Sequence, residues 1–322
     1  MMRRLLWTLL SAALPVALLA GCSDGGPQSC KVGRAADLPL LTGTRMPTVQ
    51  AGLDGQKVAL LIDTGAATSM ITPTAADHFD LSGGEDPRYV RLQGIGGVTT
   101  APIVTVHHLE LGYGHTSDID LPVGTDMRGA VQGLPLLGLF GADFLSNYDV
   151  DLDLPQHHFA MYHLTGCENI QPFDGAYFEV PFHLDGTEIL VDLKINGKPV
   201  TAQLDSGAAG TTITQDDAER IGVTDSLLSA DLIRRKMVGV DTNQVEGTAH
   251  RFGSLEIGDE RMNNFRFFVA PIQTEHTLLG DDFLHFNRVW ISYARRRLFI
   301  QPAFNNRLVR LEPTAAPTPA GH

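Results

Sequence analysis

Short apolar runs separated by turn residues recur along most of this chain, and stretches with helical periodicity are few. Asp54-Gly55 and Asn196-Gly197 each stand between apolar-rich runs, which is a strong local signal for a β-hairpin. Two segments that follow a glycine, 143–147 and 282–286, have room for a single short helix each. Further strands are predicted at Val104–Leu111, Val150–Leu154, Phe265–Pro271 and Val289–Tyr293. The pattern therefore predicts an all-β protein with a few short helices.

The chain contains the same unit twice. Residues 49–72 align with residues 191–214 at an offset of 142, and nine of the 24 positions are identical. The register continues, with offsets that drift as loop insertions would cause, through Leu109–Gly112 against Leu255–Gly258 and through Leu139–Leu145 against Leu278–Leu284. We therefore expect two lobes, at about 49–162 and 190–301, joined by a linker at 163–189.

One motif with chemical potential stands at the same place in both copies. It is Asp63-Thr64-Gly65-Ala66 in the first and Asp205-Ser206-Gly207-Ala208 in the second, each after an apolar run that predicts a buried strand. The glycine permits a tight turn, and the hydroxyl can hold the loop by a local hydrogen bond. Two carboxyl groups brought together would share one proton, so that one acts as a base on water and the other as an acid.

With these motifs in place, each half resembles the retropepsin subunit. The resemblance implies two retropepsin-like β-barrel lobes related by a pseudo-twofold axis, each with one short helix in the late motif, at Gly141–Leu145 and Gly280–Leu284. It makes Asp63 and Asp205 the catalytic pair, supported in their loops by Thr64, Gly65, Ala66, Ser206, Gly207 and Ala208. It places a glycine-rich flap at Gly94, Ile95, Gly96 and Gly97, whereas the equivalent segment around Gly239 lacks a glycine-rich tip.

The resemblance implies an aspartic endopeptidase that hydrolyses an extended polypeptide without a metal or another cofactor. Because both loops lie on one chain, a monomer would suffice. The alternative is a peptide-binding module on the same fold with weak or no catalysis, which the unequal flaps and Ser206 favour. The retained acids and glycines favour the peptidase.

Charge limits the choice of partner. The formal net charge is −13, so the chain would repel the phosphates of nucleic acid. Its densest cationic run, Arg295–Arg297, is most simply interpreted as a solvated strand end. The adjacent pairs His107-His108 and His157-His158 would point to opposite faces of a strand and so are poor metal chelators.

The first residues are typical of a lipoprotein export signal. Arg3 and Arg4 precede an apolar segment that ends in Leu19-Ala20-Gly21-Cys22, which resembles a bacterial lipobox. This predicts a signal peptide at 1–21, lipid on Cys22, a tether or arm at 22–48 and a periplasm-facing place in the cell envelope. Ser23 after the cysteine favours the outer membrane. An ordinary secretory signal, with Cys22 a bystander, is the alternative.

Three smaller expectations concern cysteines, acids and the tail. Cys30 and Cys167 either form a disulfide or remain two free buried thiols. Asp149, Asp151 and Asp153 alternate with apolar residues, which predicts a half-buried strand with a polar face. Asp143 and Asp282 recur in register and are expected to cap their short helices rather than to catalyse. The C-terminal tail comprises 302–322, and its Pro- and Ala-rich part from Glu312 is expected to be disordered.

Overall fold

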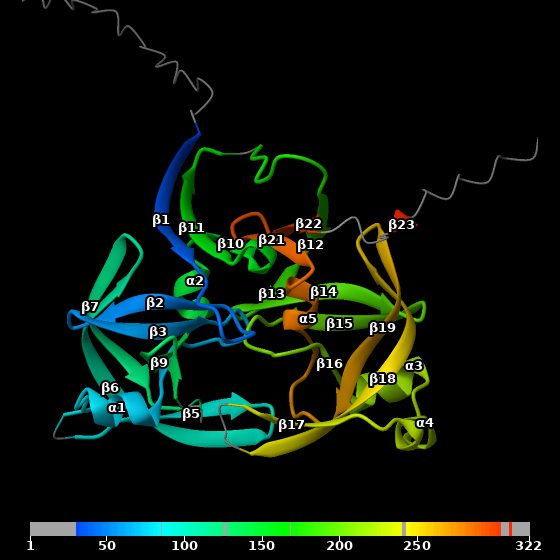
Figure 1. Cartoon of the computed structure of the whole chain (residues 1–322), viewed down its shortest axis with the longest axis horizontal. Coiled ribbons are helices and arrows are strands. Elements are labelled where there is room, and N and C mark those ends of the chain that lie inside the picture. The colour runs from blue at the N-terminus through cyan, green and yellow to red at the C-terminus, as the bar shows by residue number, and fades with distance from the viewer. Residues whose placement is uncertain are drawn as a thin grey trace, which may run out of the picture.

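The computed structural model describes residues 30–303 and 309–310, except 85, 125, 126, 128, 168 and 240–242. Two β lobes lie side by side and share a third sheet that covers both of them at one end of the molecule (Figure 1). The prediction of an all-β protein with two lobes is confirmed. The expected signal peptide, the expected lipidation site at Cys22 and most of the C-terminal tail lie outside the described residues.

The first lobe is built on one curved sheet. Its hairpin of β2 and β3 turns at Asp54 and Gly55, whose φ values of 48° and 77° are those of the tight turn that the sequence predicts. Within the described residues the strand order is β4-β9-β3-β2-β6-β5, with β7 beside β6 and β8 beside β9. The strands are β2 (Thr48–Leu53), β3 (Gln56–Ile62), β4 (Met70–Ile71), β5 (Tyr89–Gly94), β6 (Gly97–Leu111), β7 (Gly114–Pro122), β8 (Ala130–Val131) and β9 (Leu134–Phe140).

The second lobe repeats this plan. Its first hairpin turns at Asn196 and Gly197, with φ values of 50° and 76°. The described strands follow the order β13-β14-β15-β20-β16-β19-β18-β17, and β23 pairs with β19. They are β13 (His183–Asp185), β14 (Glu188–Ile195), β15 (Lys198–Leu204), β16 (Thr212–Thr214), β17 (Arg234–Val238), β18 (Gln244–Ile257), β19 (Glu260–Ala270), β20 (Thr277–Leu279) and β23 (Val309–Arg310).

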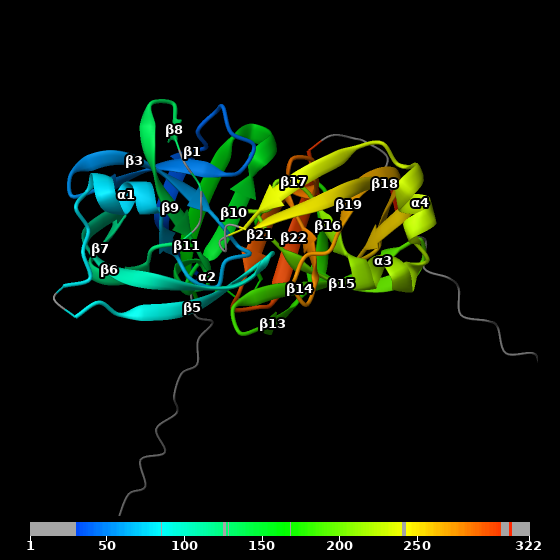
Figure 2. The same cartoon turned by 90° about the horizontal axis from the view of Figure 1, so that it is seen from below.

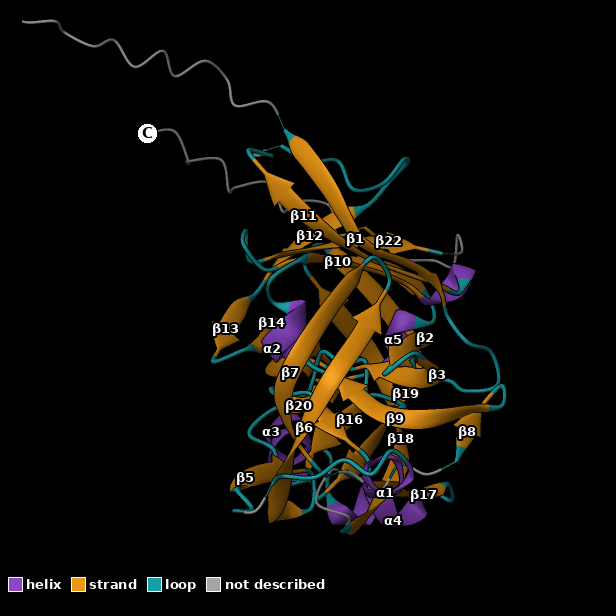
Figure 3. Cartoon of the chain, turned by 90° about the vertical axis from the view of Figure 1, so that its left-hand side faces the viewer, coloured by secondary structure: helices purple, strands orange, loops and turns teal. Residues whose placement is uncertain are grey.

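Short helices punctuate both lobes. The two predicted ones are α2 (Ala142–Leu145) and α5 (Asp281–Leu284), which lie beneath the shared sheet (Figure 3). The sequence prediction missed α1 (Pro73–His78), α3 (Gln215–Ile221) and α4 (Asp225–Ala230). The equivalent residues Thr72 and Thr214 cap α1 and α3 through their hydroxyls. Within the described residues, no helix combines the length and the apolar character needed to cross a membrane.

The shared sheet joins the two halves and is called the interlobe sheet here. Its order is β1 (Lys31–Pro39), β11 (His158–Thr165), β10 (Asp149–Asp153), β21 (Asn287–Ser292), β22 (Arg297–Pro302) and β12 (Phe178–Pro181). At its centre β10 of the first half pairs antiparallel with β21 of the second. A 3₁₀ turn (Leu154–Gln156) connects β10 to β11. Backbone hydrogen bonds between β10 and β21 therefore join the two halves of the chain.

The prediction that β10 is half-buried is wrong, because all five of its residues are buried. Its acidic face is covered by side chains from the second half. The Arg288 guanidinium donates to both oxygens of Asp151, at 2.9 Å from Nε and 2.5 Å from Nη2. The indole N–H of Trp290 donates to Asp149 at 2.9 Å. Burial is tolerated because these carboxylates are hydrogen-bonded.

The N-terminal arm is part of the fold. Residues 31–39 form β1, which pairs with β11, so the segment expected as a tether or arm at 22–48 is part of a sheet from Lys31 to Pro39. Cys30 and Cys167 form a disulfide, with their Cα atoms 4.4 Å apart. This resolves the alternative left open by the sequence in favour of the bridge. The range expected as a linker, 163–189, contains β12 and β13.

Candidate active site

Each acidic loop begins where a buried central strand ends. Asp63 follows β3 and Asp205 follows β15. Each strand has a parallel neighbour, β9 or β20, and that neighbour fixes the acid by its backbone. The Asp63 N–H donates to the Phe140 carbonyl at 2.9 Å, and the Asp205 N–H donates to the Leu279 carbonyl at 3.0 Å. The two halves thus present their acids in the same way.

The two carboxyl groups lie against each other. The side chains of Asp63 and Asp205 are hydrogen-bonded to one another. Within its own loop, Asp63 Oδ1 accepts from the N–H groups of Gly65 and Ala66, at 2.9 and 3.1 Å. Asp205 Oδ1 accepts from Gly207 and Ala208 at 2.9 and 3.0 Å. The structure therefore brings together all the loop residues that the motif selected.

The loop glycines are required by the closeness of the opposite acid. A Cβ atom added to Gly65 would lie 2.3 Å from Cγ of Asp205, and one added to Gly207 would lie 2.4 Å from Oδ2 of Asp63. No real side chain tolerates such distances to a carboxyl group. Each glycine is thus the opening through which the acid of the other lobe reaches the pair.

Two hydroxyls brace the loops across the lobe boundary. Thr64 Oγ1 donates to the Leu204 carbonyl at 2.8 Å and accepts from the Ser206 N–H at 3.0 Å. Reciprocally, Ser206 Oγ donates to the Ile62 carbonyl at 2.7 Å and accepts from the Thr64 N–H at 3.0 Å. Both side chains are buried. Each hydroxyl satisfies two backbone groups of the opposite lobe, so either residue type can do this work.

Burial and mutual charge set the pKa values of the pair. Burial raises the pKa of both acids, because the charged form loses solvation. The negative charge of Asp63 raises the pKa of Asp205 further, whereas the hydrogen bond from Asp205 lowers that of Asp63. The two acids therefore titrate as a pair, with the pKa of Asp205 raised more than that of Asp63.

The prediction that Asp143 and Asp282 cap their short helices is confirmed in part. Each acid accepts an N–H of the first turn through Oδ1, from Phe144 at 3.1 Å and from Phe283 at 3.0 Å. Gly141 and Gly280 occupy the cap positions, without side-chain caps. The two acids also hold the end of each active loop: Asp143 accepts from the N–H and hydroxyl of Ser69, at 3.0 and 2.7 Å. Asp282 accepts from the same groups of Thr211, at 2.8 and 2.6 Å. They are structural acids that also anchor a loop.

Sequence reasoning missed Asp281, a third acid near the pair. Its side chain is fully buried, and neither of its carboxyl oxygens has a hydrogen-bond partner among the described residues. Burial raises the pKa of Asp281 to about 8, against the pull of the Arg45 charge. The signal lay in the alignment, where Asp281 stands opposite Ala142 in an otherwise apolar position.

The flap of the first lobe reaches across to the second. It is the β5–β6 hairpin, whose tip holds Gly94 to Gly97. The Ile95 carbonyl accepts from the Gln273 N–H at 2.7 Å, and the Gln93 amide donates to the Gln273 carbonyl at 3.0 Å. The side chain of Ile95 packs on an apolar cluster of the second lobe, together with Ala208 and Met237 (cluster: Val245, Ala270, Ile272 and Leu278).

The second hairpin, β17–β18, provides the seat for this tip. In Figure 2 the two hairpins reach toward the middle of the molecule from opposite sides. A Cβ atom on Gly239 would lie only 2.8 Å from Cγ1 of Ile95, so the glycine leaves room for the tip of the first flap. Asn243 adds a hydrogen bond of 3.2 Å to the Gly96 carbonyl. The hairpin is docked, and Asp63 is only 8% exposed.

The remaining polar groups lie elsewhere. Among the described histidines of the two adjacent pairs, His107, His108 and His158 contact single acids rather than a shared centre. One described group, Asp185, Glu275 and His276, has ligand atoms within 4.8 Å of one another, at the surface. It is the place in the described chain where a metal could be held, and it shares no residue with the acid pair.

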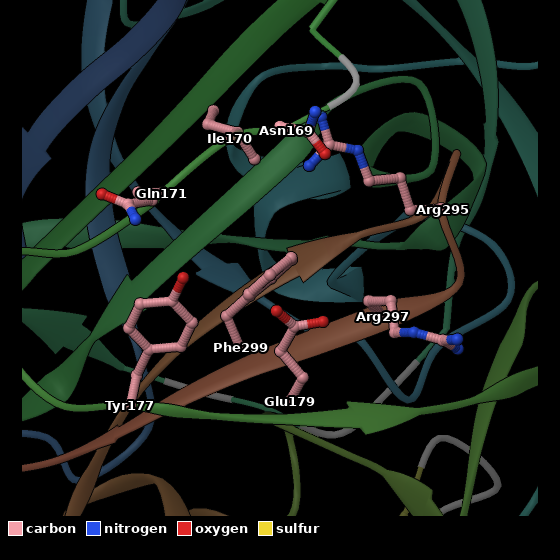
Figure 4. Close-up of a pocket in the computed structure, with 8 residues that line it drawn as sticks. All are labelled: Asn169, Ile170, Gln171, Tyr177, Glu179, Arg295, Arg297 and Phe299. Atoms are coloured by element: carbon pink, nitrogen blue, oxygen red, sulfur yellow. The ribbon is translucent and has the colours of Figure 1, made fainter.

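A hollow of about 650 Å³ lies beside the outer strands of the interlobe sheet (Figure 4). Arg295, Arg297 and Glu179 line it together with Tyr177 and Phe299. None of its residues belongs to the acidic loops or the hairpins. Arg295–Arg297 themselves lie at the connection from β21 to β22, as the interpretation of a strand end predicts.

Comparison with known families agrees with this geometry. The profile of the family described as gag-polyprotein putative aspartyl protease matches residues 49–147 and again residues 191–285. The two matches together cover more than half of the chain, and the chain belongs to this family. Each match contains one acidic loop, one hairpin and one late helix. The chain is thus a retropepsin-like protein with two repeats, and its general function is aspartic protease-like. No curated protein matches the chain.

Proposed function

We propose that the protein is an aspartic endopeptidase that hydrolyses peptide bonds of extended polypeptides. The observation that carries the proposal is the hydrogen-bonded pair Asp63–Asp205, whose two pKa values are both raised by burial. A pair that holds one proton supplies a base and an acid at the same point. The reciprocal hydroxyl braces tie the two acidic loops to each other across the lobe boundary.

The chemistry follows from the position of the proton. The Asp63 carboxylate takes a proton from a water molecule. The water oxygen attacks the peptide carbonyl carbon, and Asp205 gives its proton to the carbonyl oxygen. The resulting gem-diol collapses when Asp63 passes its proton to the leaving nitrogen and Asp205 recovers one from a diol hydroxyl. The pair ends as it began, so the cycle consumes only water.

The rate of hydrolysis should fall at both low and high pH. Activity requires a single proton on the pair, so it falls at low pH when Asp63 is protonated and at high pH when Asp205 ionises. Because burial raises both pKa values, this window lies higher than it would for two solvated aspartates.

The test is hydrolysis of an unfolded protein between about pH 4 and 7, with and without a pepstatin-type inhibitor. Asp63→Asn and Asp205→Asn should each lower the rate by roughly 10²- to 10⁴-fold. Thermal unfolding of the variants shows whether they remain folded. Wild-type protein that binds unfolded chains without cleaving them would establish the alternative, a binding module, which the docked hairpin also suits.

The envelope location is a second part of the proposal. The lipobox at Leu19–Cys22 supports lipid attachment to Cys22, with about eight residues between the lipid and β1. The protein would then face the periplasm as a monomer, with the membrane contacted only through its anchor. Cys22→Ala should release it from the membrane fraction of cells, whereas Cys30→Ala should not.

A further inference from the structure

The two halves of the site differ in charge along their hairpin strands. In each lobe one hairpin residue packs beside the active loop, Leu92 with Ala66 and Met237 with Ala208. Two residues earlier, and hence on the same strand face, stand Val90 in the first lobe and Arg235 in the second. The cross-strand partners correspond as well: Val90 faces Ala101, and Arg235 faces Gly247.

Arg235 is held beside the second active loop. Its Nη1 lies 3.4 Å from the Ala209 carbonyl, four residues after Asp205. Its guanidinium stands over the ring of Phe268, 5.6 Å from the centroid. Gly247 and Gly210 put no side chain against it. Stacking on a ring fixes the guanidinium while its N–H groups remain free to bind.

This cation has no ion-pair partner among the described residues. Asp282 also lies beside Gly210, but its oxygens are used by Thr211 and by the N–H of Phe283. Burial also raises the pKa of Asp282, which disfavours the negatively charged form that would attract the Arg235 guanidinium.

The first lobe offers the opposite chemistry at the matching place. Val90 joins an apolar group with Leu92, Met70 and Met46. An extended peptide that lies between the hairpins and the active loops would therefore meet an apolar surface at one end and a cation at the other. Strand-like binding presents alternate side chains to the two sides, so a single residue would face Arg235.

We propose that Arg235 selects substrates with an acidic residue on the second-lobe side of the scissile bond. The inference rests on the proposed peptidase function. The acidic side chain lies within about four residues of the cleaved bond, given a rise of about 3.3 Å per residue along the extended peptide. The carboxylate of that substrate residue accepts hydrogen bonds from the Arg235 guanidinium, which Phe268 and Ala209 hold in place.

The experiment uses synthetic peptides built around a bond that the wild-type protein cuts in an unfolded protein. Each position from four residues before the bond to four after it carries Glu, Gln or Lys in turn. At one position, kcat/KM should be roughly tenfold higher for Glu than for Gln, and lower again for Lys. The preference should weaken as salt rises, because a partly exposed pair is screened.

Variants assign the preference to its residue. Arg235→Gln should remove the difference between Glu and Gln, and Arg235→Glu should reverse it in favour of Lys. Lys236→Gln is the matched control, since Lys236 is the adjacent cation on the same strand and points to the other face. It should leave the preference intact. Equal kcat/KM for all three residues at every position would overturn the proposal, as would a preference that survives Arg235→Gln.

Failure of catalysis is kept distinct from failure of this inference. If the wild type cuts no peptide, binding of the same peptides is measured by fluorescence anisotropy with the wild type and with Arg235→Glu. Tighter binding of Glu peptides that reverses in the variant supports the selection even though the peptidase function has failed. Charge-independent binding overturns it.

Discussion

At the start of α2 the first half of the molecule has Ala142, whereas at the start of α5 the second half has Asp281, buried with neither oxygen hydrogen-bonded to a described residue. The hairpins differ too, since one carries the tip of Gly94–Gly97 and the other provides a seat beside Gly239. The two catalytic carboxylates, by contrast, accept the same pair of backbone N–H groups in their own loops. The proton chemistry thus constrains the two loops equally, while their surroundings are free to diverge.

The glycines next to the acids test the part that the halves share. Gly65→Ala and Gly207→Ala should each reduce activity by roughly 10²- to 10³-fold, because a methyl group would displace the opposite carboxyl. Peptide hydrolysis measures the effect. Gly114→Ala is the control, since its added Cβ would make an ordinary contact of 3.6 Å. Full activity in either variant would break the equivalence of the loops.

Asp281 tests the largest difference between the halves. Its folded pKa of about 8 lies above that of an unfolded aspartate, so its proton stabilises the fold fully at low pH. That contribution is lost at about 1.4 kcal/mol per pH unit as the pH rises above about 4 and until it reaches the folded pKa. Asp281→Asn should therefore raise the free energy of unfolding by a few kcal/mol at pH 7 and leave it nearly unchanged at pH 4.

Urea denaturation at the two pH values measures this. The mirror substitution, Ala142→Asp, should destabilise the first half with the same pH trend, because Ala142 is also fully buried. An Asp281→Asn variant whose stability follows the wild type at both pH values would show that the carboxyl finds a partner in solution.

The hydroxyl braces should behave alike in spite of their different residues. Thr64→Val and Ser206→Ala each leave a buried N–H and a buried carbonyl of the opposite lobe without a partner. We expect each to lower the free energy of unfolding by about 2 kcal/mol, measured by urea denaturation. Thr64→Ser and Ser206→Thr keep the hydroxyl and should be close to neutral. Unequal losses from Thr64→Val and Ser206→Ala would show that one lobe carries the junction.

The smallest expected effect concerns the docked tip. Ile95→Ala removes apolar contact with the second lobe, worth about 1 kcal/mol for a partly buried side chain, and should lower kcat/KM about fivefold. Val98→Ala, on the same hairpin at a largely exposed position, is the matched control. A loss of activity from Val98→Ala as large as that from Ile95→Ala would remove the special role of docking.

Sequence reasoning reached the repeats, the hairpin turns and the acid pair, because each is encoded within a few adjacent residues. Asp54-Gly55 fixes its turn locally, and Asp63-Thr64-Gly65 fixes its loop. The wrong predictions for β10 and for the N-terminal arm concern residues whose partners lie more than a hundred residues away. Asp151 looks like a solvated strand residue until Arg288 covers it, and Lys31–Pro39 looks like a tether until β11 pairs with it.

Contacts distant in sequence also explain why the prediction for Asp143 and Asp282 was incomplete. Their position after a glycine suggested a helix cap, yet Ser69 and Thr211 approach them from loops about 70 residues earlier and take the carboxylate oxygens. Asp281 was visible only as a mismatch in the alignment, and the alignment gave no indication of its burial. Local rules predicted the elements, and long-range contacts decided what the polar side chains do.

The bridge between Cys30 and Cys167 fastens the first strand at the pole of the molecule remote from the two hairpins (Figure 1). If the chain were attached to a surface ahead of Cys30, its two hairpins would face away from that surface. Polypeptides in solution would then reach the acid pair more easily than segments embedded in the surface. In that case the position of the first strand would favour dissolved substrates.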